Sequence, residues 1–126
     1  MKKEFIKTWI ERAARENRKV DEGDRFMCIW VAFNAWLKDE YGENSRDEVL
    51  VSSVKQNGQL RNIFDELKSN NLYNSLLNKL SHFHVLDMRY PENQSKIKQY
   101  TGTFESLMDV LYRIRCNLFH GRKNIE

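Results

Sequence analysis

The sequence predicts an all-α protein, a compact helical bundle of about five to six helices with one long loop before the last helix. Helix-breaking residues are scarce, because only one proline, Pro91, and five glycines occur in 126 residues. Apolar residues recur every three or four positions, which is the period of one helix face, and strand-like alternation is nearly absent. We expect residues 1–126 to form a single domain, since this length can bury a continuous core.

Two helices are predicted first. The first covers about residues 3–18, and its apolar stripe is Phe5, Ile6, Trp9, Ile10 and Ala13. The second covers about residues 24–41 and carries a broader apolar surface, formed by Phe26, Ile29, Trp30, Phe33, Trp36 and Leu37. That breadth predicts a central helix with contacts on two sides, in which the tryptophans belong to the core.

Four further helices complete the prediction. One begins at Ser45, whose spacing to Glu48 matches a capping box, and shorter ones cover residues 60–67 and 72–80. The pattern fails from residue 82 to 102, which predicts the long loop. Thr103 is expected to cap the last helix, whose inward stripe is Phe104, Leu107, Met108, Leu111, Ile114 and Leu118.

Composition predicts a cytoplasmic protein. The net charge of +3 gives only a slight preference for nucleic acid. Cys28 and Cys116 are too few and too far apart for a disulfide framework, which fits a reducing compartment. The N-terminus lacks the apolar core of a signal peptide, and no apolar run approaches the roughly 20 residues of a membrane span. We therefore expect no membrane association.

The segment near the end of the chain is the predicted site of chemistry. No acidic residue occurs from residue 110 to 125, so its cations lack a neutralising neighbour in the sequence; they are Arg113, Arg115, Arg122 and Lys123. Arg115 is a permanent planar cation suited to phosphate oxygens, and His120 can transfer a proton near neutral pH. Together they predict a phosphodiester substrate.

The side chains of Arg115 and His120 cannot both reach one substrate from a single straight helix. Five residues correspond to about 140° around an ideal helix, so a straight helix directs the two side chains differently. A left-handed Gly121 that ends the helix at His120 is one solution. A twofold axis that brings two copies of both residues to one cleft is another, and we predict a homodimer.

The segment Arg115-Cys116-Asn117-Leu118-Phe119-His120 resembles the hallmark of the HEPN domains, an arginine followed shortly by a histidine near the end of a long helix. Phe119-His120-Gly121 and the basic residues after it look like a common form of that hallmark, and residues 30–37 are similar to the aromatic helix of some HEPN branches. The position after the arginine, often asparagine in the family, is Cys116 here.

The resemblance implies metal-independent cleavage of RNA by its 2′-hydroxyl, without a cofactor. Arg115 and His120 would be catalytic, and Asn117 and Asn34 would support them. Further RNA contacts are assigned to Arg113, Arg122 and Lys123. The resemblance also implies a toxin or antiviral defence effector, with a neutralising antitoxin or partner protein as a possible companion.

Other interpretations stay open. Arg115 could pair with Asp109 or Asp87, and His120 could simply interact with the helix dipole. The whole chain could be a non-catalytic RNA-binding or protein-assembly module, or a purely structural helical dimer. We predict no metal site, because the histidines of His82-Phe83-His84 have no further ligands at suitable spacing.

Overall fold

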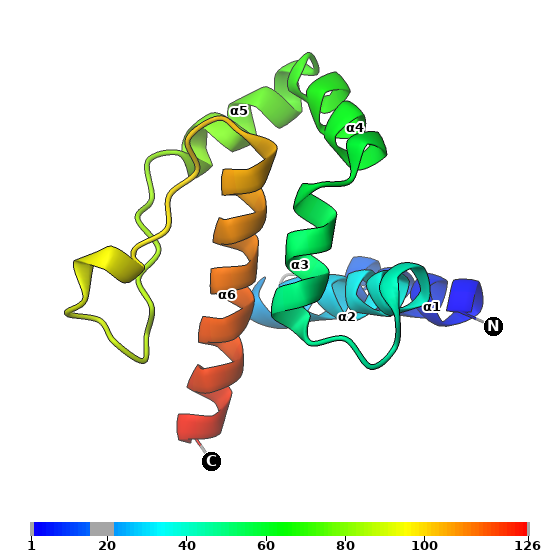
Figure 1. Ribbon diagram of the computed structural model, residues 1–126, viewed down its shortest axis with the longest axis horizontal. Coiled ribbons are helices and arrows are strands. Elements are labelled where there is room, and N and C mark those ends of the chain that lie inside the picture. Colours follow the sequence, from blue (N-terminus) through cyan, green and yellow to red (C-terminus); the bar gives the residue numbers. More distant parts are fainter. Residues whose placement is uncertain (1, 16–21, 126) are drawn as a thin grey trace. The chain divides into compact units, whose positions relative to one another are not determined.

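The computed structural model describes the backbone of residues 2–15 and 22–125, and the side chains of residues 3–14 and 22–119. Six α-helices and no strand occur in these residues (Figure 1). The predicted fold class, all-α with about six helices, is confirmed for this part of the chain.

The chain divides into two compact units, Met1–Ser53 and Val54–Glu126, and each is described by itself. Helix α3 (Asp47–Lys55) crosses from the first unit into the second. The expectation of a single domain over residues 1–126 stays a prediction.

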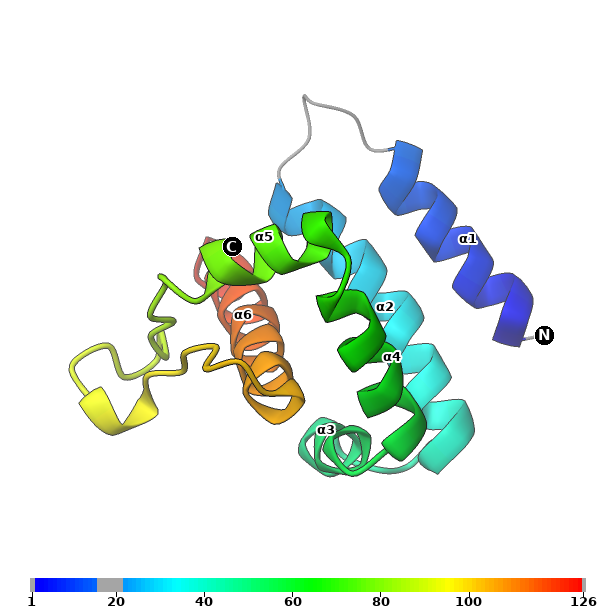
Figure 2. The same ribbon diagram turned by 90° about the horizontal axis from the view of Figure 1, so that it is seen from above.

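In the first unit, α1 (Lys2–Arg15) and α2 (Glu22–Tyr41) pack side by side and run in opposite directions (Figure 2). The part of the first predicted helix beyond Arg15 lies outside the described residues. The second helix is confirmed over its predicted length and extends two residues further toward the N-terminus.

A row of aromatic rings runs along α2. Trp30 stacks on Phe26, with 6.2 Å between ring centroids, and meets Phe33 edge-on at 5.4 Å. Phe33 in turn stacks on Trp36 at 6.2 Å. Rings three or four residues apart meet because they share one helix face. Trp30 is buried, as predicted for the core, whereas Trp9 and Trp36 are half-buried.

Two short helices of the second unit begin at asparagines. The Asn57 side chain accepts a hydrogen bond from a backbone amide three residues later at 3.0 Å and caps α4 (Gly58–Lys68). The Asn70 side chain accepts two such bonds, at 2.9 and 3.3 Å, and caps α5 (Asn71–Leu80). Both helices lie where the apolar pattern predicted them, and the caps explain why they start there.

The last helix, α6 (Phe104–Ile125), is the longest. Thr103 caps it as predicted, because its hydroxyl accepts a hydrogen bond from the Ser106 amide at 3.1 Å. Val110 is only 1% exposed although it is not part of the predicted stripe, so the buried face of α6 is wider than predicted. Lys55, at the end of α3, forms an ion pair with Asp109 of this helix.

Between α5 and α6 the chain forms an irregular arm, residues 81–103, which confirms the long loop. Its two limbs are joined by Val85 and Lys98, which exchange backbone hydrogen bonds of 2.8 and 2.9 Å. The tip contains one 3₁₀ turn, Gln94–Lys96. Gly102 has a positive φ of 97°, which is costly for other residues, and turns the chain into α6.

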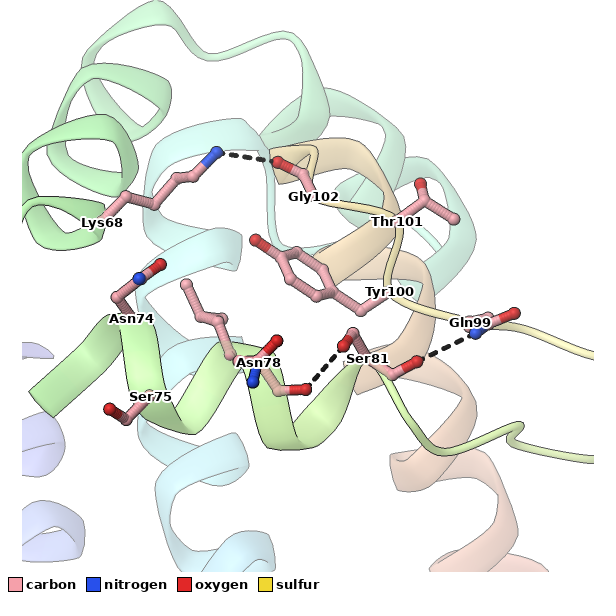
Figure 3. A pocket seen from close by; sticks show the side chains of 10 residues that line it. Lys68, Asn74, Ser75, Asn78, Ser81, Gln99, Tyr100, Thr101 and Gly102 are labelled. Atoms are coloured by element: carbon pink, nitrogen blue, oxygen red, sulfur yellow. Dashed lines mark hydrogen bonds between the residues drawn. The ribbon is translucent and has the colours of Figure 1, made fainter. Parts of the chain in front are cut away.

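A cavity of about 590 Å³ lies where the arm returns beside α5 (Figure 3). Its lining consists of Lys68, Asn74, Ser75, Leu77, Asn78, Ser81, Gln99, Tyr100, Thr101 and Gly102. All ten residues belong to the second unit. No helix in the described ranges carries an apolar stretch long enough to span a bilayer.

Candidate functional site

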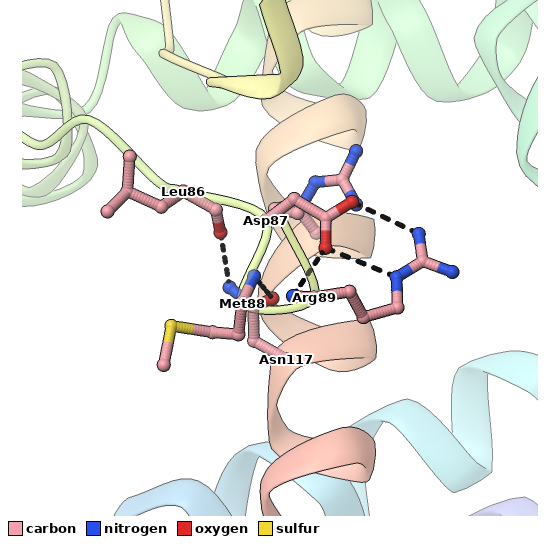
Figure 4. Close-up of polar contacts among 6 residues, drawn as sticks. Leu86, Asp87, Met88, Arg89 and Asn117 are labelled. Atoms are coloured by element: carbon pink, nitrogen blue, oxygen red, sulfur yellow. Dashed lines mark hydrogen bonds and ion pairs between the residues drawn. The ribbon is translucent and has the colours of Figure 1, made fainter. Parts of the chain in front are cut away.

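The arm is fastened to α6 by side-chain hydrogen bonds (Figure 4). The Asn117 side chain accepts a bond from the Met88 amide at 3.0 Å and donates one to the Leu86 carbonyl at 2.7 Å. One amide side chain thereby satisfies two backbone groups of the arm, much as a neighbouring strand would. We call Asn117 and the three charged residues beside it, Asp87, Arg89 and Arg113, the clasp.

Asp87 is the centre of the clasp and is only 2% exposed. The Arg113 guanidinium donates to its carboxylate at 2.8 Å from α6. Arg89 donates through Nε at 3.2 Å, through Nη2 at 3.1 Å and through its backbone amide at 3.0 Å. The carboxylate is therefore compensated by two cations, as a buried charge requires.

These contacts hold the pKa of Asp87 at about 2, below its usual value of 3.8. The side-chain hydrogen bond from Arg89 is the largest cause; burial opposes it, and the Arg89 amide and the Arg113 charge add to it. A shift of this size corresponds to about 2 kcal/mol, and water around the 44% exposed Arg89 side chain reduces that value. The same bond raises the pKa of Arg89.

Arg113 was predicted to contact RNA because it lies in a segment, residues 110–125, that contains no acidic residue. In the fold it has such a neighbour, Asp87, and its side chain is only 14% exposed. The reason for assigning Arg113 to RNA is therefore lost, since its charge is already compensated inside the protein. Its contact with RNA itself stays a prediction.

The two predicted supporting asparagines differ in their surroundings. Asn117 binds the arm through both polar atoms of its side chain, which are thus engaged in the fold. Asn34 lies on α2 in the first unit, half-buried, and its Oδ1 has no hydrogen-bond partner within the described ranges. A supporting role for either residue stays a prediction.

Arg115 is half-buried on α6, and its guanidinium carbon lies 5.3 Å from the centre of the Phe119 ring. The two residues are one helical turn apart, so this cation–π contact limits the orientations of the arginine. The carboxylates considered as its partners have other cations beside them. Asp109 pairs with Lys55, and Asp87 pairs with the arginines of the clasp.

The expectation that Gly121 ends the final helix is wrong. Helix α6 continues through it to Ile125, because a glycine weakens a helix interior but does not stop it. Positions 115 and 120 are therefore about 140° apart on an unbroken helix. His120, Arg122 and Lys123 were predicted as site residues. Their side chains lie outside the described part of the chain, so their surroundings stay unassigned.

Arg89 is the charged residue next to this helix that sequence reasoning missed. The sequence does contain a signal for this contact, the order Asp87-Met88-Arg89 within a loop. An aspartate side chain often accepts a hydrogen bond from the backbone amide two residues later. No group of three histidine, cysteine or acidic side chains that could hold a metal ion occurs in the portion of the chain with a described structure.

Comparison with known proteins adds no relative: no family model, no curated protein and no solved structure matches this chain. A function must therefore be proposed from the chain's own residues and from the resemblance of the Arg115–His120 segment.

Proposed function

We propose that this protein is a HEPN-like endoribonuclease that cleaves RNA without a metal ion. His120 accepts the proton of a ribose 2′-hydroxyl, which attacks the adjacent phosphorus as the bond to the 5′ oxygen breaks. The departing 5′ oxygen takes a proton from water, and the His120 imidazolium returns its proton to water, so the products are a 2′,3′-cyclic phosphate and a 5′-hydroxyl. Arg115 stabilises the charge on the phosphoryl oxygens, and Arg122 and Lys123 contact neighbouring phosphates.

The observation that carries the proposal is the pairing of Arg115 with His120 on the long final helix. The contact with Phe119 supports the assignment of Arg115, because a guanidinium with few orientations loses little entropy when it binds phosphate. Arg113 is the least supported of the proposed RNA contacts, since Asp87 compensates its charge.

A second copy of the chain completes the proposed site. Because Gly121 lies inside the helix, positions 115 and 120 of one chain point in different directions around it. A twofold axis along the end of α6 would place Arg115 of one copy near His120 of the other. We therefore propose a homodimer, and a role as a toxin or antiviral defence effector that a partner protein neutralises.

The direct test is cleavage of single-stranded RNA in EDTA by the wild type, His120→Ala and a control, His82→Ala, whose histidine is exposed on the arm. We expect the control to retain activity and His120→Ala to lose about 100-fold or more, because proton transfer contributes roughly that factor. Equal cleavage by the wild type and His120→Ala would remove His120 from the mechanism.

Mixing two inactive variants tests the shared site. When Arg115→Ala and His120→Ala chains are unfolded and refolded together, mixed dimers have one site with an intact arginine from one copy and an intact histidine from the other. We expect about a quarter of wild-type activity, since half of the dimers are mixed and each has one complete site. No recovery, with mixed dimers present by mass spectrometry, would rule out this arrangement.

A non-catalytic RNA-binding or protein-assembly module is the second candidate. Two observations favour it: Cys116 stands where the HEPN family often has a polar residue, and both polar atoms of Asn117 bind the arm. RNA that is bound at low salt, released as salt rises and recovered intact after long incubation would support this module over the nuclease.

A further inference from the structure

Tyr100 is a largely buried residue whose hydroxyl remains accessible and faces a cavity. The residue is only 5% exposed, and its ring meets Phe64 edge-on with 6.5 Å between centroids. Its hydroxyl has no hydrogen bond to any residue in the described ranges and points into the space beside Lys68 and Asn74 (Figure 3). Burial raises the pKa of Tyr100, so the hydroxyl keeps its proton and acts as a donor.

The rest of the lining is rich in donors as well. Lys68 is half-buried, held by the Gly102 carbonyl at 3.0 Å and by the Phe64 ring at 5.3 Å from Nζ, which leaves two ammonium hydrogens for a ligand. The amides of Asn74 and Asn78 lie one helical turn apart on α5. None of the ten lining residues is acidic, so the lining has a formal charge of +1.

We propose that this cavity binds a small phosphorylated molecule through its phosphoryl group. A terminal phosphate offers three acceptor oxygens to the lysine, the tyrosine and the asparagines, one more than a carboxylate offers. The volume of about 590 Å³ exceeds what the phosphate needs, and it falls in the range of sites that hold a whole small ligand. The site is independent of the proposed cleavage of RNA.

The test is calorimetric titration of the full chain with inorganic phosphate, adenosine 5′-monophosphate and adenosine. We expect saturable binding of the two phosphates, and at least tenfold weaker binding of adenosine. Tyr100→Phe keeps the ring and removes only the donor, so it should weaken phosphate binding about tenfold. Lys68→Gln should weaken it further. Tyr90→Phe, in an exposed tyrosine of the arm, is the control and should bind like the wild type.

Absence of saturable binding of both phosphates up to about 10 mM would overturn the proposal, and so would equal affinity in the wild type and Tyr100→Phe. A short RNA that binds in a Tyr100-dependent way, while phosphate and the mononucleotide do not, would also overturn it and assign the cavity to RNA. His120→Ala should leave phosphate binding unchanged, which separates this test from that of the nuclease.

Discussion

Replacing Asp87 by asparagine tests whether the clasp stabilises the second unit. The change removes one negative charge and leaves Arg113, at 14% exposure, beside a neutral amide. Loss of one partner from a fully buried ion pair costs about 3–5 kcal/mol. Here the 44% exposed Arg89 lets water screen part of the attraction, and asparagine keeps one acceptor oxygen. We therefore expect a loss of about 2 kcal/mol, close to the value from the pKa of Asp87.

The measurement is urea unfolding at neutral pH, followed by circular dichroism, with thermal unfolding as a second readout. For a chain of this length a loss of about 2 kcal/mol corresponds to a melting temperature lower by roughly 6–10 °C. The matched control is Asp65→Asn, because Asp65 is exposed on α4 and has no ion pair in the described part of the chain. The control should change stability by less than about 0.5 kcal/mol.

The pH dependence gives an independent check. Since folding lowers the pKa of Asp87 to about 2, its contribution is fully present above the unfolded value, near pH 4, and is lost as the pH falls toward 2. The wild type should therefore lose more stability than Asp87→Asn between pH 5 and pH 2. Parallel curves for the two proteins, or equal losses in Asp87→Asn and Asp65→Asn at pH 7, would refute the reasoning.

Two further substitutions address α6 and its contact with the arm. Asn117→Ala removes both bonds to the arm, so amide exchange at Met88 should accelerate at least tenfold. Asn62→Ala, at an exposed position of α4, should leave this exchange unchanged. Unaltered exchange at Met88 would show that Asn117 does not hold the arm. Gly121→Ala should stabilise the protein by about 0.5–1 kcal/mol, because the helix continues through this position. Destabilisation instead would indicate a left-handed glycine at the helix end.

The helices could be predicted because their signals are local. Periodic apolar residues located five of the six, and Thr103 marked the start of α6 correctly. The capping-box pattern located α3, which begins at Asp47, two residues after the predicted start at Ser45. In the structure Asn57 and Asn70 cap α4 and α5 through bonds to amides two or three residues away. The partners in such contacts are only a few residues apart, so the sequence can reveal them.

The clasp could not be predicted because its contacts are not local. Asp87 and Arg113 are 26 positions apart, and an irregular loop offers no periodic pattern that pairs it with a helix. Asp87 had been considered as a partner of Arg115, two residues from its actual partner on α6, Arg113. Gly121 shows a second limit: one glycine is compatible with a helix end or a helix interior, and the contacts that decide between them come from elsewhere in the fold.

The arm is bound to a helix that follows it in the sequence. This order determines when the arm can fold during synthesis. During synthesis, residues 86–89 emerge before their anchors at positions 113 and 117 exist. Until α6 has formed, Arg89 is the only residue of the clasp that can pair with Asp87. The exposed side chains of Met88 and Tyr90 then belong to a segment that is not yet bound to α6. Nascent chains that stop before Asn117 should therefore be sensitive to proteases and prone to aggregation.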